Sequence, residues 1–120
     1  METVANVLVG LVAALHLYIL VMEMFLWQRP QGRKFHGFDA EMAGATAKMA
    51  ANQGLYNGFL AAGLVWGLIA ADPTGFRAQV FFLACVIVAG VYGAVTANRR
   101  ILFAQALPGA IALAAVLVAR

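Results

Sequence analysis

The sequence predicts an all-α integral membrane protein, an up-down four-helix bundle in a single domain. Hydrophobic residues make up 64% of the 120 residues and charged residues only 11%, whereas soluble domains carry about twice that share of charge. The chain contains four apolar stretches, each close to the ~20 residues that a helix needs to cross the hydrocarbon core of a bilayer. Because backbone amides have no water to bond in lipid, each stretch is expected to be helical.

The predicted spans cover approximately residues 3–27, 45–71, 76–98 and 100–119. The first contains one charged residue, Glu23. It is expected to be a retained span, because no Lys or Arg precedes Arg29 as a signal peptide would require. The cores of the other three spans carry no charge and run from Met49 to Ala71, from Ala78 to Asn98 and from Ile101 to Ala119.

The longest connection runs from Gln28 to Lys48. It opens with the turn-forming residues 28–32, which are expected to end the first helix at the membrane surface. Asp39 is a predicted N-cap, and Glu41 falls in the first turn, where the helix dipole favours an acid. The second helix is therefore expected to begin near Ala40, ahead of its apolar core.

The other connections, 72–75 and 98–100, are short, and short connections join antiparallel neighbours. Lys and Arg are divided unequally between the two sides of the predicted bundle. The side of the long connection has six, Arg29, Arg33, Lys34, Lys48, Arg99 and Arg100, and the other side has two, Arg77 and Arg120. This bias predicts a multi-pass protein of the bacterial inner membrane, with the long connection in the cytoplasm and both termini outside.

Small residues recur four apart in two of the spans. They are Gly54, Gly58 and Ala62 in the second span, and Ala89, Gly93 and Ala97 in the third. Residues four apart share one face of a helix, and small side chains let helices approach closely in lipid, so these faces are predicted helix contacts. The alternative is that Gly and Ala are simply common in spans.

Ionisable residues inside spans are costly, so they are the first candidates for function. His16 and Glu23 lie about 20° apart around the first helix and about 10 Å apart along its axis, too far for a direct bond. We expect Glu23 to carry a charge or a proton and His16 to act as a deeper proton relay. The alternatives are that Glu23 pairs with Arg29, Arg99 or Arg100 at the interface, and that His16 is a neutral core histidine.

Further polar side chains are expected at one depth, in the cytoplasmic half of the bilayer. Tyr92 comes late in the third span and Gln105 early in the fourth. An arc of about 140° on the second helix carries Asn52, Gln53, Tyr56 and Asn57. Together with Glu23, these side chains predict a substrate-binding pocket that opens toward the cytoplasm, while the outer half is expected to be nearly pure hydrocarbon. The alternative is that the amides only bond one helix to another.

Several chemistries are excluded by what the sequence lacks. Cys85 is the only cysteine, so no intrachain disulfide or paired-thiol site can form. The spans hold no paired carboxylates, and the chain has no glycine-rich phosphate loop or nucleophile elbow. One His and one Glu in the spans are too few ligands for a metal. The basic residues lie at span ends, where they are topology signals and headgroup contacts, so no nucleic acid, metal or cofactor is expected.

A longer pattern covers the second span and the end of the first. It consists of the run Ala51–Leu60, which includes the string Asn-Gln-Gly-Leu-Tyr-Asn-Gly, preceded by His16, Tyr18, Glu23, Met24, Phe25 and Trp27. The chain resembles in these residues a bacterial family of small four-span membrane proteins catalogued as a domain of unknown function, family 1304. The resemblance implies the architecture and no established activity. These residues do not support the automatic "epimerase" label that some members carry.

A second resemblance is one of layout. An outside N-terminus, a long basic cytoplasmic loop, a polar second helix, and Tyr and Arg residues near the cytoplasmic end of the third helix are similar to the four-span glutathione and eicosanoid membrane enzymes, which are trimers. Those enzymes carry a Glu and an Arg in an Asn-containing motif of the second helix. This chain has Asn52 and Asn57 there but no Arg.

Three functions remain open. The leading hypothesis is a module that binds or transports a small polar or amphipathic molecule; since four helices are too few to enclose a wide path, transport predicts a homo-oligomer. The second is a membrane enzyme acting on a lipophilic substrate or thiol conjugate, with Tyr92 or His16 as acid or base and Arg99 and Arg100 holding an anionic group. The third is a structural or accessory subunit that docks a partner through its small-residue faces.

Overall fold

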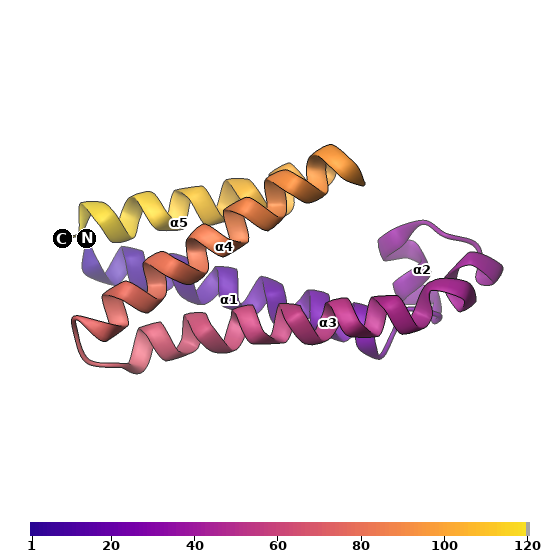
Figure 1. The fold of residues 1–120 in the computed structure, drawn as a ribbon, viewed down its shortest axis with the longest axis horizontal. Helices are drawn as coiled ribbons and strands as arrows, with labels where there is room; N and C mark the ends of the chain where they lie inside the picture. The colour runs from indigo at the N-terminus through magenta and orange to yellow at the C-terminus, as the bar shows by residue number, and fades with distance from the viewer. Residues whose placement is uncertain (120) are drawn as a thin grey trace. The chain divides into compact units, whose positions relative to one another are not determined.

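The computed structural model describes residues 1–119, which are almost entirely helical (Figure 1). The elements are α1 (Glu2–Met24), α2 (Pro30–His36), α3 (Ala40–Ile69), α4 (Thr74–Thr96), a π-helical turn η1 (Leu102–Ala106) and α5 (Leu107–Val118). Arg120, which the orientation argument counts on the outer side, lies outside the described residues. The chain forms two compact units: unit 1 is Met1–Ala14 with the chain from Leu60 onward, and unit 2 is Leu15–Phe59.

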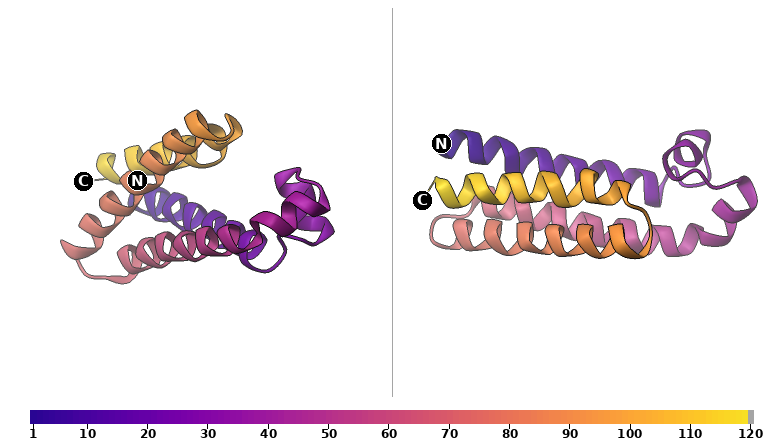
Figure 2. Two further views of the ribbon diagram at one scale, coloured as in Figure 1. Left: turned by 45° about the vertical axis from the view of Figure 1, so that its right-hand side comes forward. Right: turned by 90° about the horizontal axis from the view of Figure 1, so that it is seen from above.

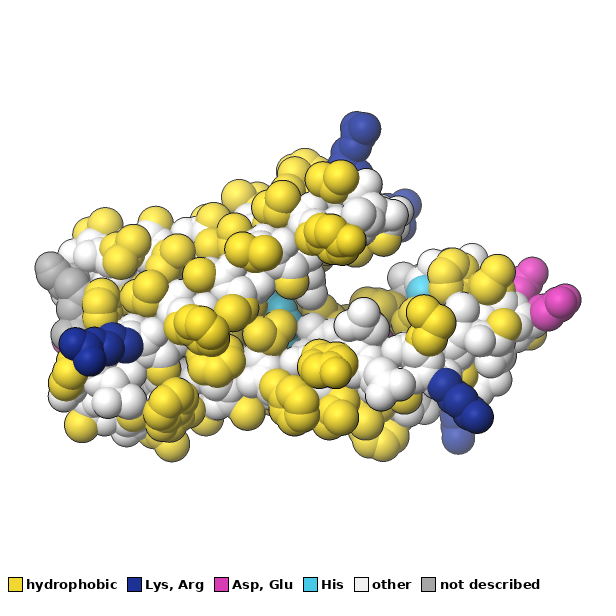
Figure 3. Space-filling view, in the orientation of Figure 1, with side chains coloured by type: hydrophobic (Ala, Val, Ile, Leu, Met, Phe, Trp, Pro, Cys, Tyr) yellow, Lys and Arg dark blue, Asp and Glu magenta, His cyan; other side chains and the backbone are white. Residues whose placement is uncertain are grey.

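The predicted all-α class is confirmed. Among the described residues, two helices, α1 and α4, are long and apolar enough to cross a bilayer, and the apolar helical stretch Leu102–Val118 is shorter. Large apolar side chains are exposed along α1, α3, α4 and α5, and hydrophobic side chains cover much of the face shown in Figure 3. Exposed apolar surface of this extent is unusual for a soluble monomer. The four-span membrane bundle itself stays a prediction.

The predicted start of the helix that contains the second span is confirmed. The helix α3 begins at Ala40, and the Met42 N–H donates to Asp39 Oδ1 at 2.8 Å, which is the hydrogen bond of an N-cap. The first helix, by contrast, ends at Met24, three residues before the predicted limit. The helix α2 in fact begins inside the predicted turn-rich stop, residues 28–32. Pro30 lies at the first position of α2, where its missing N–H costs nothing and its fixed φ suits a helix.

The helix α2 is folded tightly onto the end of α1 within unit 2. A β-carbon at Gly32 would come within 2.8 Å of Trp27 Cα and still closer to the Leu26 carbonyl, so only glycine permits this contact. The Trp27 carbonyl lies 2.7 Å from His36 Nε2, and the two rings are 4.1 Å apart. On its other side the Trp27 indole Nε1 donates to Thr46 Oγ1 at 3.0 Å, which joins this turn to α3. Trp27 therefore helps to hold unit 2 together.

Unit 1 has one hydrophobic core to which segments of α1, α3, α4 and α5 contribute. Its fully buried members include Val9, Leu64, Leu83, Val86 and Ala112. The helices α4 and α5 run side by side in opposite directions (Figure 2). The start of α1 lies at the same end of unit 1 as the end of α5 (Figures 1 and 2).

The fourth predicted span is not one uninterrupted α-helix. It begins with the wider π-helical turn η1 and continues as α5, whose second residue is Pro108. Proline has no N–H to offer the carbonyl four residues earlier and its ring crowds that turn, so a widened turn before it relieves the clash. The predicted limits 100–119 thus enclose two helix types in place of one.

The predicted helix contacts at small residues are confirmed in part. In unit 2, β-carbons at Gly54 and Gly58 would come within 2.5 Å of Met24 Cγ and 2.7 Å of Leu20 Cδ1, so both glycines lie at the contact of α3 with α1. In α4 the prediction holds only for Gly93, where a β-carbon would lie 3.2 Å from the Ile101 side chain, because Ala89 and Ala97 are exposed. The close approach of α4 occurs at Gly90, where a β-carbon would lie 2.7 Å from the Ala106 backbone nitrogen in η1.

Gly90→Val is expected to destabilise the protein by about 1–3 kcal/mol, because the new side chain meets backbone that cannot rotate away. Gly10→Val is the matched control, since a β-carbon at Gly10 has nothing within 4 Å. Thermal unfolding in detergent should show a lower midpoint for the first variant and little change for the second. Equal midpoints for the two variants would contradict the close contact of α4 with η1.

Candidate functional site

The clearest polar contact between helices lies in unit 2, between Glu23 of α1 and Asn57 of α3. Asn57 Nδ2 donates to Glu23 Oε1 at 2.6 Å and also to the Gln53 carbonyl of its own helix at 3.0 Å. Glu23 and Asn57 are both half-buried. Hydrogen bonds to a carboxylate are shorter and stronger than those between neutral groups. The pair therefore fixes the carboxylate at the α1–α3 contact.

Helix geometry explains why Asn57 alone of its arc reaches Glu23. The arc that carries the polar side chains of α3 spans about 140°, and Asn57 lies at the edge nearest to Gly54, about 60° away. Gly54 is where α1 approaches α3, since a β-carbon there would lie 3.1 Å from Glu23 Cβ. Asn57 is thus brought within reach of the carboxylate, and the rest of the arc turns away from it.

The remaining predicted residues of α3 lie on the exposed side of the helix. Asn52 is exposed and donates to the Lys48 carbonyl at 3.2 Å, and Gln53 is exposed. The side chain of Tyr56 is 62% exposed, with its ring edge-on to Phe59. Within unit 2 these three do not gather around Glu23. Their predicted role in binding stays a prediction.

His16 is completely buried, with 0% of its surface exposed. It lies on the same face of α1 as Leu20 and Glu23, because residues four and seven apart share a helix face. That face contacts α3 at Gly58 and Gly54. Its position is compatible both with a deeper relay behind Glu23 and with a core histidine, so the two interpretations remain open.

The other predicted site residues belong to unit 1. The side chain of Tyr92 is 70% exposed on α4, and its carbonyl accepts the Thr96 hydroxyl at 2.7 Å. Gln105 is partly buried in η1. Arg99 and Arg100 are exposed in the turn between α4 and η1, where the Arg100 N–H donates to Asn98 Oδ1 at 2.9 Å. Convergence of these residues with Glu23 stays a prediction.

Two of the alternatives for Glu23 can be compared within unit 2. The carboxylate accepts its hydrogen bond from Asn57 and makes no ion pair with Arg29 among the described residues. Bonding of one helix to another is thus one role of the pair. Asn57 has both of its donated hydrogen bonds in use, whereas no described residue donates to the second carboxylate oxygen of Glu23. That oxygen is available to a ligand or to water.

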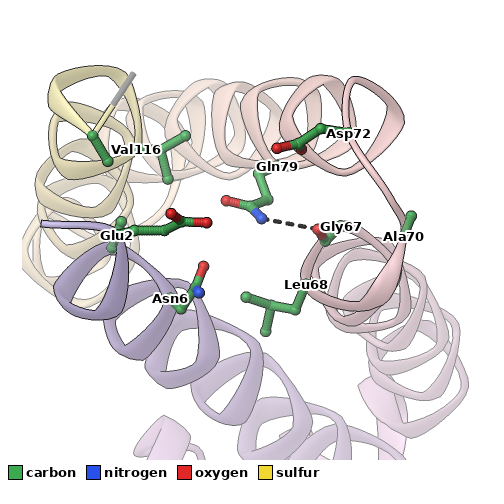
Figure 4. A pocket seen from close by; sticks show the side chains of 10 residues that line it. Glu2, Asn6, Gly67, Leu68, Ala70, Asp72, Gln79 and Val116 are labelled. Atoms are coloured by element: carbon green, nitrogen blue, oxygen red, sulfur yellow. Dashed lines mark hydrogen bonds between the residues drawn. The ribbon is translucent and has the colours of Figure 1, made fainter.

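A second set of polar side chains, which the sequence pattern did not predict, surrounds a cavity of about 130 Å³ in unit 1. Side chains from the starts of α1 and α4 and from the α3–α4 turn point into it (Figure 4). The polar members are Glu2, Asn6, Asp72 and Gln79. Gln79 Nε2 donates to the Gly67 carbonyl at 2.8 Å, and Asp72 Oδ1 accepts from the Phe76 N–H at 3.2 Å.

The polar lining of this cavity corrects the expectation that the half of the bundle predicted to be outer is nearly pure hydrocarbon. Asn6 and Gln79 fall inside predicted spans and were the available signal, since amides in apolar helices are as exceptional there as in α3. They were not predicted as a group because each is the only amide side chain in its helix. Among the described residues, no group of three or more His, Cys, Asp or Glu side chains is placed to hold a metal ion.

Comparison with known proteins gives a family without an assigned activity. Residues 10–117 match the model of a family described as protein of unknown function (DUF1304). The chain is also similar to the uncharacterized protein YpaA of Lactococcus lactis subsp. lactis (strain IL1403), with 26% identity over 106 residues, which are 86% of this chain and 88% of that protein. No solved structure matches. The family model covers the chain from the first third of α1 nearly to the end of α5, and the protein belongs to the DUF1304 family.

Proposed function

We propose that this protein is a four-span protein of the bacterial inner membrane that binds or transports a small polar or amphipathic molecule at Glu23. The observation that carries the proposal is the hydrogen bond from Asn57 to Glu23, which holds a carboxylate between two largely apolar helices and leaves one of its oxygens without a donor. Intramembrane carboxylates are costly and mark substrate or proton pathways.

The membrane setting is supported by α1 and α4, which are long and apolar enough to cross a bilayer. The other two proposed spans would be α3, with 30 residues, and the helical stretch Leu102–Val118, which rises about 25 Å. Exposed apolar side chains such as Phe59, Phe81 and Ile111 would then face lipid. The excess of Lys and Arg near α2 favours a cytoplasmic position for the long connection and an outside position for both termini.

In this proposal Glu23 is the charge or proton carrier and His16 is the deeper relay. Asn52, Gln53, Tyr56, Tyr92 and Gln105 would line the path of the ligand. Four helices enclose little space between them, so transport would require a homo-oligomer in which exposed faces of α3 and α4 meet a second copy. The exposed ring of Tyr56 and the exposed ring of Tyr92 are suited to such contacts.

The two alternatives have less support. Docking of a partner through Gly54 and Gly58 conflicts with their contacts to Met24 and Leu20, which already occupy that face within unit 2. For an enzyme, no described side chain forms a hydrogen bond with the exposed Tyr92 hydroxyl, so no base is positioned beside it among the described residues.

Topology is tested by single cysteines in a Cys85→Ser background. A membrane-impermeant maleimide is expected to label Thr74→Cys in intact spheroplasts, because the α3–α4 turn is proposed to lie outside. It is expected to label Glu41→Cys only after the membrane is permeabilised. Both positions are exposed in the folded chain. Labelling of Glu41→Cys from the outside would reverse the proposed orientation.

Ligand-dependent proton movement tests the role of Glu23. Proteoliposomes with an internal pH dye would be offered primary amines and quaternary ammonium compounds one at a time, since the available carboxylate oxygen suits a cation. Glu23→Gln is expected to reduce any compound-dependent proton movement to the rate of protein-free liposomes. The variant keeps an oxygen that can accept from Asn57, so the helix contact should survive while the charge is lost.

Glu41→Gln is the matched control, because it removes the same charge from an exposed position in the first turn of α3. It should behave as the wild type in both proton movement and compound-induced thermal stabilisation. Unchanged proton movement in Glu23→Gln rejects the proton role. Unchanged stabilisation of Glu23→Gln by a compound that stabilises the wild type rejects Glu23 as its binding site.

A further inference from the structure

The segment that joins α1 to α3 carries a cluster of cations without counter-charges. Residues 24–38 contain Arg29, Arg33 and Lys34 and no Asp or Glu. None of the three forms an ion pair with a described residue. Arg29 and Arg33 are four residues apart, so their side chains lie on one face of the turn and repel each other.

The Arg33 side chain has a nitrogen atom, Nε, without a hydrogen-bond acceptor. Its Nε is buried from solvent and has no hydrogen-bond partner in the described chain, although the rest of the side chain is partly exposed. A buried donor without an acceptor carries its full desolvation cost, more so on a charged group. A planar guanidinium group can bind two oxygens of one phosphate or carboxylate through two parallel N–H donors.

The backbone that carries these cations is held in place. Gly32 packs against Leu26 and Trp27 with no room for a side chain, and the Trp27 carbonyl is 2.7 Å from His36 Nε2. The Phe38 N–H donates to His36 Nδ1 at 2.9 Å, and Gly37 ends the helix at φ 81°. The cluster is therefore part of a built turn, and an anion that binds it need not order a loose loop.

Exposed aromatic rings lie in the same short segment of unit 2 as the cluster. The side chain of Phe25 is 67% exposed, and Phe35 and Phe38 are also exposed. Phe35 meets Tyr18 of α1 edge-on, with ring centroids 6.0 Å apart. Rings and cations side by side at the end of an apolar helix match the boundary of a bilayer, where hydrocarbon gives way to phosphate.

We propose that Arg33 and Arg29, with Lys34 beside them, bind the phosphate group of an anionic phospholipid in the leaflet where α1 ends. The phosphate accepts hydrogen bonds from the solvent-exposed donors of these side chains and supplies the negative charge that the segment lacks. The exposed phenylalanines contact the acyl chains just below it. This inference rests on the proposed membrane insertion of α1 and is independent of the ligand at Glu23.

Lipid titration of the full-length protein in neutral detergent, followed by native mass spectrometry, tests the site. The wild type is expected to bind phosphatidylglycerol in preference to phosphatidylcholine. Arg33→Gln is expected to weaken phosphatidylglycerol binding by about tenfold, since it removes a charge-assisted hydrogen bond. Arg33→Lys is expected to lose most of the preference too, because an ammonium group keeps the charge but cannot present two parallel N–H donors.

Arg77→Gln is the control, because it removes an exposed arginine from the first turns of α4 in unit 1. It should bind phosphatidylglycerol as the wild type does. Should Arg33→Gln fail to fold, Arg29→Gln on the same face carries the test with the same expected loss.

Three results would overturn the proposal. Equal binding of the two lipids by the wild type removes the site while leaving membrane insertion intact. Full phosphatidylglycerol binding by Arg33→Gln and Arg29→Gln removes these residues as ligands. If millimolar inorganic phosphate displaces the bound lipid completely, and lipids with the same acyl chains show no headgroup preference, the cluster binds a soluble anion instead.

Discussion

The contact of α1 with α3 at Gly54 and Gly58 decides what this chain can do with its polar groups. Because these two positions have no side chain, the helices lie so close together that an added β-carbon would clash with Leu20 or Met24 of α1. At that separation Asn57 reaches Glu23 at 2.6 Å. A bulkier residue at Gly54 would press on the turn of α1 that carries the carboxylate, because an added β-carbon already lies 3.1 Å from Glu23 Cβ and 3.3 Å from the Leu20 carbonyl oxygen.

The same principle operates in unit 1 through different residues. The helix α4 meets η1 at Gly90, and α5 meets α4 at Gly109, where a β-carbon would lie 3.0 Å from Val86. Between apolar helices there is little hydrophobic gain from choosing one neighbour over another in lipid, so close backbone approach becomes the source of specificity. Both proposed activities of unit 2 depend on such contacts: Glu23 is placed by Gly54, and the cationic turn is placed by Gly32.

Helix boundaries were predicted correctly from the sequence where a single residue determines them. Asp39 and the start of α3 at Ala40 were predictable because an N-cap is a bond between neighbours in the chain. The helix α2 was missed because Pro30 and Gly32 look like breakers, whereas Pro30 begins the helix and Gly32 packs it. The π-helical turn before Pro108 was not predicted, because the apolar pattern of the fourth span does not distinguish a π-helical turn from an α-helical one.

Sequence alone determined the long apolar helices and the presence of polar residues within them, because these follow from composition and hydrophobicity along one segment. The tertiary structure decided which polar residues meet. Among the amides of α3 only Asn57 bonds to Glu23, and Asn6 and Gln79, which no motif marks, share a cavity with Glu2 and Asp72. The rotation and separation of two helices set such contacts, and both depend on glycines from segments that are far apart in the chain.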